Sequence, residues 1–345
     1  MKKSEKFLLF ILVIIFLFLI GFGSFCIIIK PFYKNSVQVI DKVENSDIIN
    51  IDTDVELSND VNEIEYEHEN INRIEQKEDE IINVLLVGMD ARKNETKSRS
   101  DTIILVSYNK TEHIVKMVSF LRDTWVYIYD KGWGRINTAT AYGGIGLLIN
   151  TLNEDFDLDI QNYVQIKFED FKEVIDILGG IDIELSKSEI RYINNKLHTE
   201  DKDWNNDVVA EPGIVHLNGI QTLWHCRNRS IGEGDFSRTD RQREVLDILM
   251  NQCLNMPLTE LPISIYQLKD YVDMNIPLSL IINIGKDALI SKDLTVESYR
   301  IPFDGYYNFA NKNGASVIEI DLDKTKEKLH EILGFSDDKI LDDFE

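Results

Sequence analysis

Residues 7–29 form an uninterrupted apolar run, and this run limits where the rest of the chain can fold. About 20 apolar residues in a helix are enough to cross a hydrocarbon core of roughly 30 Å. Lys2, Lys3 and Lys6 precede the run. Because cytoplasmic flanks carry an excess of positive charge, we expect residues 1–6 in the cytoplasm and the remainder outside. The sequence thus predicts a single-pass protein of the cell membrane, attached through an N-terminal transmembrane signal anchor.

A signal peptide that is removed is the alternative to this anchor. Such peptides carry a shorter apolar region than the run found here. Gly21, Gly23 and Ser24 also provide only a poor small-residue cleavage site. An uncleaved anchor over residues 7–29 is therefore the prediction.

The segment after the anchor is acidic and rich in asparagine, and residues 41–80 contain almost no aromatic side chains. Such a segment buries too little apolar surface to fold, and repulsion between its charges extends it. We expect residues 30–80 to form an extracytoplasmic stalk, or an acidic linker without a partner. No linker interrupts residues 81–345, and the 43% hydrophobic content of the chain supports a sizeable core. This part is predicted to be one domain outside the membrane.

Apolar and amphipathic stretches alternate through this domain. Strands are expected over residues 82–87, 102–108, 113–120, 163–168, 181–185, 296–301 and 316–320. Helices are expected over residues 138–153, 171–178, 217–226 and 239–253, with a loop over 228–238. This alternation is typical of an α/β fold. We therefore expect a mixed central sheet covered by helices, an α-β-α sandwich.

Arginines are concentrated in one short window of a chain whose formal net charge is −23. The window contains Arg227, Arg229, Arg238, Arg241 and Arg243. So acidic a chain is repelled by nucleic acid, and no nucleic-acid partner is expected. The planar guanidinium fork suits phosphate oxygens, so the window points to a phosphate or diphosphate ligand. A solvated helix face paired with neighbouring acids remains the alternative.

Two carboxylates flank the loop between the first two predicted strands. Asp90 ends the first strand, and Asp101 precedes the second, with Arg99 beside it. Mg²⁺ favours one or two carboxylates together with phosphate oxygens of a substrate. The pair therefore indicates a divalent-metal site, although strand-end aspartates also serve as turns or helix caps.

Other common catalytic arrangements are missing from the sequence. The six histidines show no zinc-binding spacing, and no serine nucleophile elbow is present. Asp182 and Glu184 alternate along a predicted strand, which favours exposure to solvent over a catalytic carboxylate pair. Cys226 and Cys253 do not make a disulfide framework.

Six sets of motifs, in their order and spacing, resemble those of the LytR-CpsA-Psr family of envelope proteins. They are NVLLVGMD (83–90), RSDTI (99–103), SFLRD (119–123), RIN (135–137) with AYGG (141–144), LNG (217–219) with RNR (227–229), and GDFSRTDRQ (234–242). The resemblance covers most of the predicted domain, and the anchor and stalk agree with it.

The resemblance implies a phosphotransferase. Such an enzyme takes a polymer, for example teichoic acid or a capsular polysaccharide, from a polyprenyl diphosphate carrier and joins it to peptidoglycan by a phosphodiester. Phosphoryl transfer relies mainly on positioning and electrostatics, which agrees with many cations and no evident nucleophile. Two alternatives remain open: a pyrophosphatase that passes the same intermediate to water, and a non-catalytic envelope binding or regulatory protein.

The resemblance also implies roles for individual residues. Asp90 and Asp101 correspond to a Mg²⁺ site, with Mn²⁺ as the other possible ion. The groups around the diphosphate correspond to Arg99, Arg122, Arg135, Arg227, Arg229, Arg238 and Gln242. Arg122 corresponds to the arginine most directly responsible for catalysis, and Asp123 or Asp101 is expected to accept the proton of the attacking hydroxyl.

Departures from the family pattern are few, and none removes a charged residue of the predicted site. Leu121 stands where proline commonly precedes the arginine, Arg135 replaces a frequent lysine, and His225 with Cys226 before Arg227 is unusual. For the lipid tail we expect an apolar groove with walls from residues 145–152 and 174–178. Arg122→Ala and Arg238→Ala are each expected to lower turnover at least about tenfold without loss of the fold.

Overall fold

The computed structural model of the protein describes residues 81–91, 98–200, 208–255, 267–268, 270–276, 280, 284 and 295–335. The predicted cytoplasmic tail, anchor and stalk lie outside these residues. Of the helices in the described ranges, none has both the length and the apolar character that a membrane crossing requires.

Among the described residues, a mixed sheet of six strands lies at the centre, in the order β10-β3-β2-β1-β6-β9. Its strands are β1 (Ile81–Met89), β2 (Ser100–Asn109), β3 (Ile114–Phe120), β6 (Asn162–Lys167), β9 (Asp273–Met274) and β10 (Thr295–Ile301). β1 lies antiparallel to β2 and parallel to β6, and β3 lies parallel to β10. The predicted α/β class with a mixed central sheet is confirmed.

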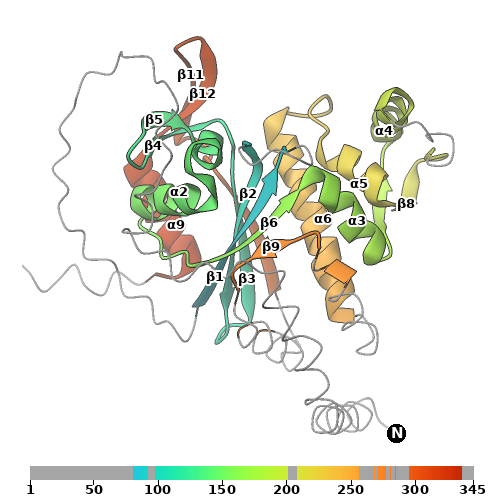
Figure 1. Cartoon of the computed structure of the whole chain (residues 1–345), viewed down its shortest axis with the longest axis horizontal. Helices are drawn as coiled ribbons and strands as arrows, with labels where there is room; N and C mark the ends of the chain where they lie inside the picture. Colours follow the sequence, from blue (N-terminus) through green and yellow to red (C-terminus); the bar gives the residue numbers. More distant parts are fainter. Residues whose placement is uncertain are drawn as a thin grey trace, which may run out of the picture.

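Helices cover both faces of this sheet (Figure 1). α2 (Ala139–Phe156) and α9 (Leu322–Leu333) lie on one side, and α3 (Phe168–Ile177), α5 (Gly219–Cys226) and α6 (Asp235–Asn255) lie on the other. On the α2 side, Leu85, Leu105 and Phe120 of the sheet pack in one core with Leu148 and Leu329. Because successive strand residues point to opposite faces, neighbours such as Leu86 and Ile104 are left to face the second helical layer. This arrangement is the predicted sandwich.

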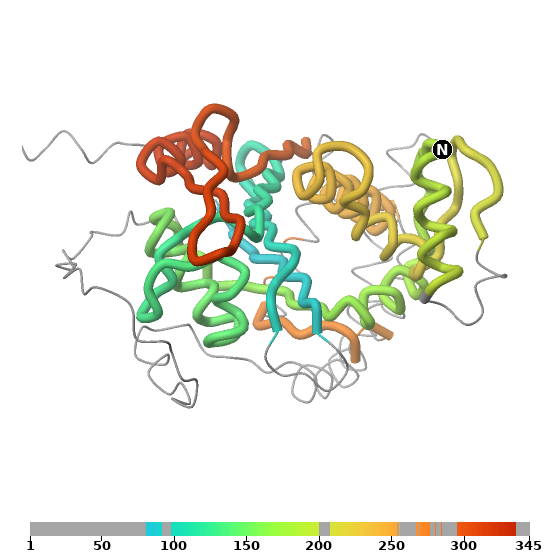
Figure 2. The backbone as a smooth tube through the Cα atoms, turned by 90° about the horizontal axis from the view of Figure 1, so that it is seen from above, coloured from blue at the N-terminus to red at the C-terminus, as the bar shows by residue number. Residues whose placement is uncertain are grey.

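In the described ranges two smaller sheets flank the sandwich, and of their strands the sequence predicted those at residues 181–185 and 316–320. One has the order β11-β12-β4-β5 and consists of β4 (Thr124–Ile128), β5 (Gly132–Arg135), β11 (Tyr307–Lys312) and β12 (Ala315–Ile320). The other pairs β7 (Ile181–Leu185) with β8 (Gly213–Leu217), next to α4 (Lys187–Glu200). Seen from above, the red segment that carries β11 and β12 lies beside the green segment of β4, β5 and α2 (Figure 2). Pairing β12 with β4 joins distant parts of the chain, which local periodicity does not reveal.

Several element boundaries differ from the predicted ones. α6 begins at Asp235, inside the predicted loop 228–238, so Arg238 lies on a helix. α4 was not predicted, although Ile190, Ile193 and Leu197 recur at helical spacing and are buried. α2 is interrupted at Gly143 and Gly144, and Gly144 has φ 67° and ψ −161°, a conformation that is essentially restricted to glycine. Asp182 and Glu184 are exposed on β7, as expected.

A buried carboxyl group links α2 to β4 and should make stability depend on pH. Asp155 is 8% exposed, and its Oδ2 accepts a hydrogen bond from the Tyr127 N–H at 3.2 Å. Burial raises the pKa of Asp155 to about 7. The folded protein therefore holds this proton more tightly than the unfolded chain does. The stability that this group contributes is present at low pH and is lost as the pH rises towards about 7.

We expect Asp155→Asn to reduce the fall in stability between about pH 4 and pH 7. Asn can still accept the Tyr127 hydrogen bond but carries no charge. At pH 8 the midpoint of thermal unfolding should rise by about 3 °C or more. Thermal unfolding of the variant, the parent and the exposed-site control Glu112→Gln across this range is the measurement. Equal pH slopes in Asp155→Asn and the parent would contradict the assignment.

Candidate functional site

The charged residues singled out from the sequence come from separate elements. Asp101 lies on β2, Arg122 and Asp123 directly follow β3, Arg135 ends β5, Arg227 and Arg229 follow α5, and Arg238 and Gln242 lie on α6. Most of them meet at one end of the central sheet through the ion pairs given below. Their spread along the chain means that strand pairing and helix packing, and not local sequence, bring them together.

Asp101 owes its position to an irregularity in β2. Gly88 pairs with Thr102, but Met89 pairs with Ser100, so Asp101 has no opposite residue on β1. A bulge of this kind inserts an extra residue and redirects its side chain. The Asp101 side chain is only 8% exposed, so its charge has to be balanced by nearby cations.

Three guanidinium groups, which we call the arginine cluster, surround Asp101: those of Arg122, Arg229 and Arg238. Arg122 Nη1 lies 2.7 Å from Asp101 Oδ1, and Arg229 Nη2 lies 3.3 Å from Oδ2. Arg238 Nη1 is 3.7 Å from Oδ2, and its Nη2 donates to the Asp101 carbonyl oxygen at 3.0 Å. The Arg238 side chain is 2% exposed, which makes it the most deeply buried member.

Asp235, at the start of α6, contacts the same three arginines. Its Oδ2 accepts from Arg238 Nη2 at 3.0 Å, and its Oδ1 lies 3.4 Å from Arg229 Nε and 3.6 Å from Arg122 Nε. From the sequence, Asp235 was interpreted only as an acid that pairs with arginines on a solvated helix face. Its position beside Gly234, in the motif that contains Arg238, was the signal that could have assigned it to the site.

Asp123 and Arg135 extend the network on the side of β4 and β5. Arg135 Nη1 donates to Asp123 Oδ1 at 3.2 Å, and Arg122 Nε lies 3.7 Å from Asp123 Oδ2. Four arginines thus face three carboxylates in this part of the chain. The excess of positive charge suits an anionic ligand such as a phosphate.

Burial shapes the protonation of the cluster. It lowers the pKa of Arg238 to about 10, although Asp235 opposes the change. It also raises the pKa of Asp235 above its ordinary value, against the pull of the arginines. Burial acts to lower the pKa of Arg122 as well, but Asp101 and its neighbours outweigh it, and the pKa is raised. Arg122 and Arg238 therefore remain charged near neutral pH, while Asp235 accepts a proton more readily than a free aspartate.

Leu121, which departs from the family pattern, is compatible with the position of Arg122. Its side chain is fully buried in a small apolar cluster with Phe236 and Ile318. Its N–H donates to the Ile301 carbonyl oxygen at 2.9 Å, a hydrogen bond that a proline could not make. Leu121 therefore holds the turn that carries Arg122 through apolar packing and a backbone hydrogen bond.

Asp90 and Arg227 form a second pair beside this network. Arg227 Nη2 lies 3.7 Å from Asp90 Oδ1, and the Asp90 N–H donates to the Arg99 carbonyl oxygen at 3.1 Å. That hydrogen bond continues the pairing of β1 with β2, which keeps Asp90 and Asp101 at the same end of the sheet. Arg99 itself is exposed and makes no ion pair within the described ranges.

The donor set of Asp90 and Asp101 fits a divalent metal only in part. Asp90 is 52% exposed and so is accessible, whereas the Asp101 carboxylate is engaged by the arginine cluster. In the part of the chain that the structure describes, no group of three or more His, Cys, Asp or Glu side chains could hold a metal. Two carboxylates match Mg²⁺ or Mn²⁺ when phosphate oxygens and water complete the coordination.

α5 is built so that Arg227 emerges at its end. Asn218 and Gln221 form a reciprocal capping box that starts the helix. Gly219 is needed there, because a Cβ atom would lie 2.1 Å from the Lys172 carbonyl oxygen of α3. The helix can therefore pack directly against α3, and it ends at Cys226.

An apolar cavity of about 220 Å³ lies between the sheet and the helices α3, α5 and α6. Its walls include Leu86, Ile104, Val164, Phe168, Phe171, Val174, Leu223, Val245 and Leu249. Arg227 and Gln242 line it as well, and the Arg227 guanidinium lies 5.0 Å from the Phe168 ring centroid. Gln242 Oε1 is buried without a hydrogen-bond partner among the described residues. The cavity thus joins apolar walls to polar groups next to the arginine cluster.

Of the two segments expected to form walls of a lipid groove, one borders the apolar cavity and the other does not. Val174 of α3 lines the cavity. The segment 145–152 instead packs on the opposite face of the sheet, where Leu147, Leu148 and Leu152 are fully buried in the main core. The apolar character of α2 serves the core, because α2 covers the face of the sheet that points away from the cavity.

Comparisons with known proteins agree with this fold. Residues 49–331 match the LytR_cpsA_psr family. Regulatory protein MsrR of Staphylococcus aureus is 31% identical over 261 residues, which are 74% of this chain and 76% of that protein. The polyisoprenyl-teichoic acid–peptidoglycan teichoic acid transferase TagU of Oceanobacillus iheyensis is 30% identical over 260 residues, 73% of this chain and 71% of that protein.

A solved structure of the LytR-CPS2A-psr family protein YwtF (TagT) of Bacillus subtilis contains a bound octaprenyl pyrophosphate lipid. It is 26% identical to this chain, with a TM-score of 0.57, and the likeness covers 74% of this chain and 91% of that one. The family match extends over most of the chain and includes every residue of the network described above. The chain therefore belongs to the LytR_cpsA_psr family.

Proposed function

We propose that the protein transfers a glycopolymer, such as a teichoic acid or a capsular polysaccharide, from a polyprenyl diphosphate to peptidoglycan. The observation that carries this proposal is the apolar cavity that meets charged groups at Arg227, next to the arginine cluster. A polyprenyl diphosphate combines an apolar tail with an anionic head, and these two regions complement its two parts. The name of the relative TagU and the lipid bound to TagT support the same substrate class.

In the proposed reaction, a hydroxyl oxygen of peptidoglycan attacks the phosphorus that carries the glycan. A new phosphorus–oxygen bond forms to this phosphorus. In line with it, the bond from the same phosphorus to the bridging oxygen of the diphosphate breaks, so polyprenyl phosphate leaves. Arg122 and Arg229 hold the phosphate oxygens, and the buried Arg238 adds positive charge behind them, so that together they balance the charge that shifts onto the leaving group. Asp101 and Asp235 keep these guanidinium groups in position before the substrate arrives.

The hydroxyl proton must pass to a carboxylate as the new bond forms. Asp123 and Asp101 are the bases expected from the motifs, and the structure adds Asp235 as a candidate. Asp101 Oδ1 already lies 2.7 Å from Arg122 Nη1, so a guanidinium group occupies this oxygen. Asp235 contacts the same arginines, and burial raises its pKa, which favours its uptake of a proton.

We also propose that Asp90 and Asp101, with phosphate oxygens, hold Mg²⁺ or Mn²⁺. A bound metal would supply further positive charge beside the diphosphate. Chelation with EDTA should lower turnover about tenfold or more, and added Mg²⁺ should restore it. In an assay of the full chain, Asp90→Asn should raise the Mg²⁺ concentration needed for half-maximal turnover, whereas Glu112→Gln should not. Full activity in EDTA would reject the metal site.

The remaining part of the proposal concerns location. The apolar run over residues 7–29 would anchor the chain as a single-pass membrane protein, with the catalytic domain outside the cytoplasm. This placement brings the domain to the same membrane surface as a lipid-linked donor. Protease accessibility of the domain in intact cells, compared with lysed cells, would test it: protection in intact cells would contradict the topology.

Incubation of the full chain in detergent micelles with a polyprenyl-diphosphate glycan, Mg²⁺ and peptidoglycan fragments tests the function. The expected products are glycan joined to the fragment by a phosphodiester and free polyprenyl phosphate. Release of phosphorylated glycan to water would instead establish a pyrophosphatase. Tight binding of the donor without turnover would support a binding or regulatory protein.

A further inference from the structure

Arg241 is a buried arginine of α6 that is not a member of the arginine cluster, and no step of the reaction described above uses it. The residue is 8% exposed. Its Nε donates to Glu189 Oε1 at 3.1 Å, and its Nη1 and Nη2 donate to the carbonyl oxygens of Asn228 and Ile231, each at 3.1 Å. A guanidinium group has a rigid fork of donors, so it can hold several acceptors at fixed positions. Arg241 thus connects three parts of the chain: α6, α4 and the segment between α5 and α6.

The two carbonyl oxygens lie on either side of Arg229 in the sequence. Asn228 directly precedes Arg229, and Ile231 follows it two positions later. Asn228 is fully buried, and its Oδ1 accepts a hydrogen bond from the Ser230 N–H at 3.0 Å. The backbone is therefore held both before and after Arg229, which fixes the direction in which this side chain leaves the backbone.

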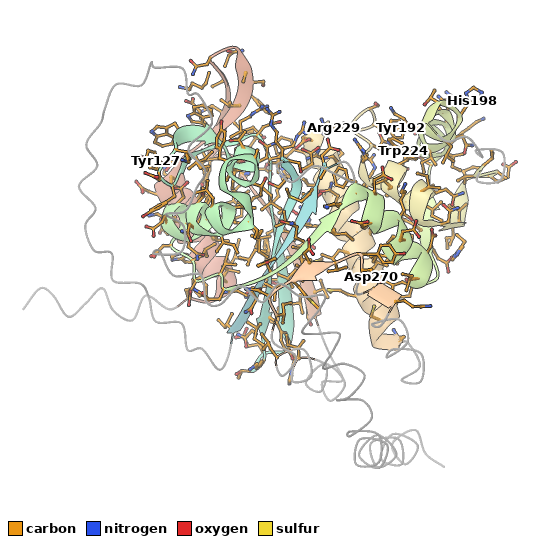
Figure 3. The ribbon with its side chains drawn as sticks, in the orientation of Figure 1. Tyr127, Tyr192, His198, Trp224, Arg229 and Asp270 are labelled. Atoms are coloured by element: carbon orange, nitrogen blue, oxygen red, sulfur yellow. The ribbon has the colours of Figure 1, made fainter. Side chains whose placement is uncertain are left out.

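The position of the Arg229 side chain depends on this support. Its guanidinium group reaches Asp101 Oδ2 at 3.3 Å and Asp235 Oδ1 at 3.4 Å, yet the side chain is 42% exposed. An ion pair of a long, exposed side chain contributes little by itself, because ordering the side chain costs conformational entropy. Tyr192 of α4 makes a further contact with the segment, since its hydroxyl group donates to the Arg227 carbonyl oxygen at 3.5 Å. Figure 3 shows Tyr192 and Arg229 at the same end of the molecule.

Glu189, in the first turn of α4, holds the Arg241 guanidinium group from the other side. Its Oε1 accepts from Arg241, and its Oε2 accepts from the Ser186 N–H at 3.0 Å and from the Ser186 hydroxyl group at 2.7 Å. Burial acts to raise the pKa of Glu189, but the hydrogen bonds from Ser186 and Arg241 outweigh it, and the pKa is lowered. The carboxylate is therefore ionised at neutral pH and forms a charged pair with Arg241.

On the basis of the proposed function, we infer that Arg241 and Glu189 are positioning residues for Arg229. They hold residues 228–231 so that the Arg229 guanidinium group is directed at the diphosphate before the ligand binds. Both act through Arg229 and do not contact the ligand themselves. α4 thereby supports the site, although it contributes no member of the arginine cluster.

The test compares Arg241→Lys in the parent and in an Arg229→Ala background, with octaprenyl diphosphate as the probe and the full chain in detergent micelles. Lysine keeps the positive charge, but one ammonium group cannot bind all three acceptors in the same geometry. In the parent this change should weaken binding of the probe about fivefold. In the Arg229→Ala background it should change binding less than about twofold, because the side chain that Arg241 positions is gone. Glu189→Gln should follow the same pattern with a smaller factor.

Arg191→Lys, at an exposed position on α4, is the matched control and should change binding in neither background. Thermal unfolding would check the fold of each variant, and Glu189→Gln alone decides the question if Arg241→Lys does not fold. Equal weakening in both backgrounds would make the pair a general support of the fold and overturn the inference, as would unchanged binding in the parent. The probe needs no acceptor and no turnover, so a parent that binds it but transfers no glycan would reject the proposed function alone.

Discussion

Replacing Arg122 with alanine is expected to lower kcat about 100-fold or more while the protein stays folded. Arg122 contacts Asp101 at 2.7 Å and lies within 3.7 Å of Asp123 and 3.6 Å of Asp235, so its guanidinium group is held in place before substrate binds. Preorganised charge of this kind acts mainly on the transition state, and losing one such group typically costs about 10²–10³ in rate. The KM for the lipid-linked donor should therefore change less than kcat.

The measurement is steady-state transfer of glycan to peptidoglycan fragments by the full chain. Arg191→Ala, at an exposed position on α4, is the matched control and should retain the parent rate. Arg122→Lys should recover only a small part of the loss, because an ammonium group cannot reproduce the planar fork that spans several oxygens. A near-normal kcat for a folded Arg122→Ala protein would remove the arginine cluster from the mechanism.

Arg238→Ala is expected to cost about 3–5 kcal/mol of unfolding free energy as well as activity. The Arg238 side chain is 2% exposed, and it lies between Asp235 and Asp101, whose side chains are 17% and 8% exposed. Truncation would remove the guanidinium group that donates to Asp235 Oδ2 and to the Asp101 carbonyl oxygen. Among the described residues, the two carboxylates would keep only the more exposed Arg122 and Arg229 as partners, and breaking a buried ion pair is strongly destabilising. From the sequence alone the variant was expected to keep its fold, and the burial of Arg238 changes that expectation.

The midpoint of thermal unfolding of Arg238→Ala should fall by about 10 °C, whereas that of Arg191→Ala should stay near the parent value. Combining Arg238→Ala with Asp235→Asn should restore part of the loss, since the half-buried carboxylate that has lost its hydrogen-bonded arginine is then neutral. The two single variants and the double variant complete a thermodynamic cycle for this pair. Strict additivity of the two changes would show that Arg238 and Asp235 do not depend on each other.

The fold class and most regular elements could be predicted because their signals are local. Strands such as β1 and β7 are short apolar or alternating runs, and each lies within a residue or two of its predicted bounds. β5 and β11 gave weaker signals, since they are short and contain Gly or Asn, whereas β4 was missed although all of its residues are β-branched or aromatic. α6 was shortened in the prediction because its charged first turn resembles a loop.

Sequence by itself determined the residue types of the site: the motifs identify the arginines, the carboxylates and the family that uses them. Only the tertiary structure decided how these groups meet. It placed Arg238 against the carbonyl oxygen of Asp101, 137 positions away, and it added Asp235 to the network. It also assigned the apolar run of α2 to the core and Val174 to the cavity. The reason is that periodicity records which side of an element is apolar, whereas strand pairing, a bulge and helix packing decide what that side faces.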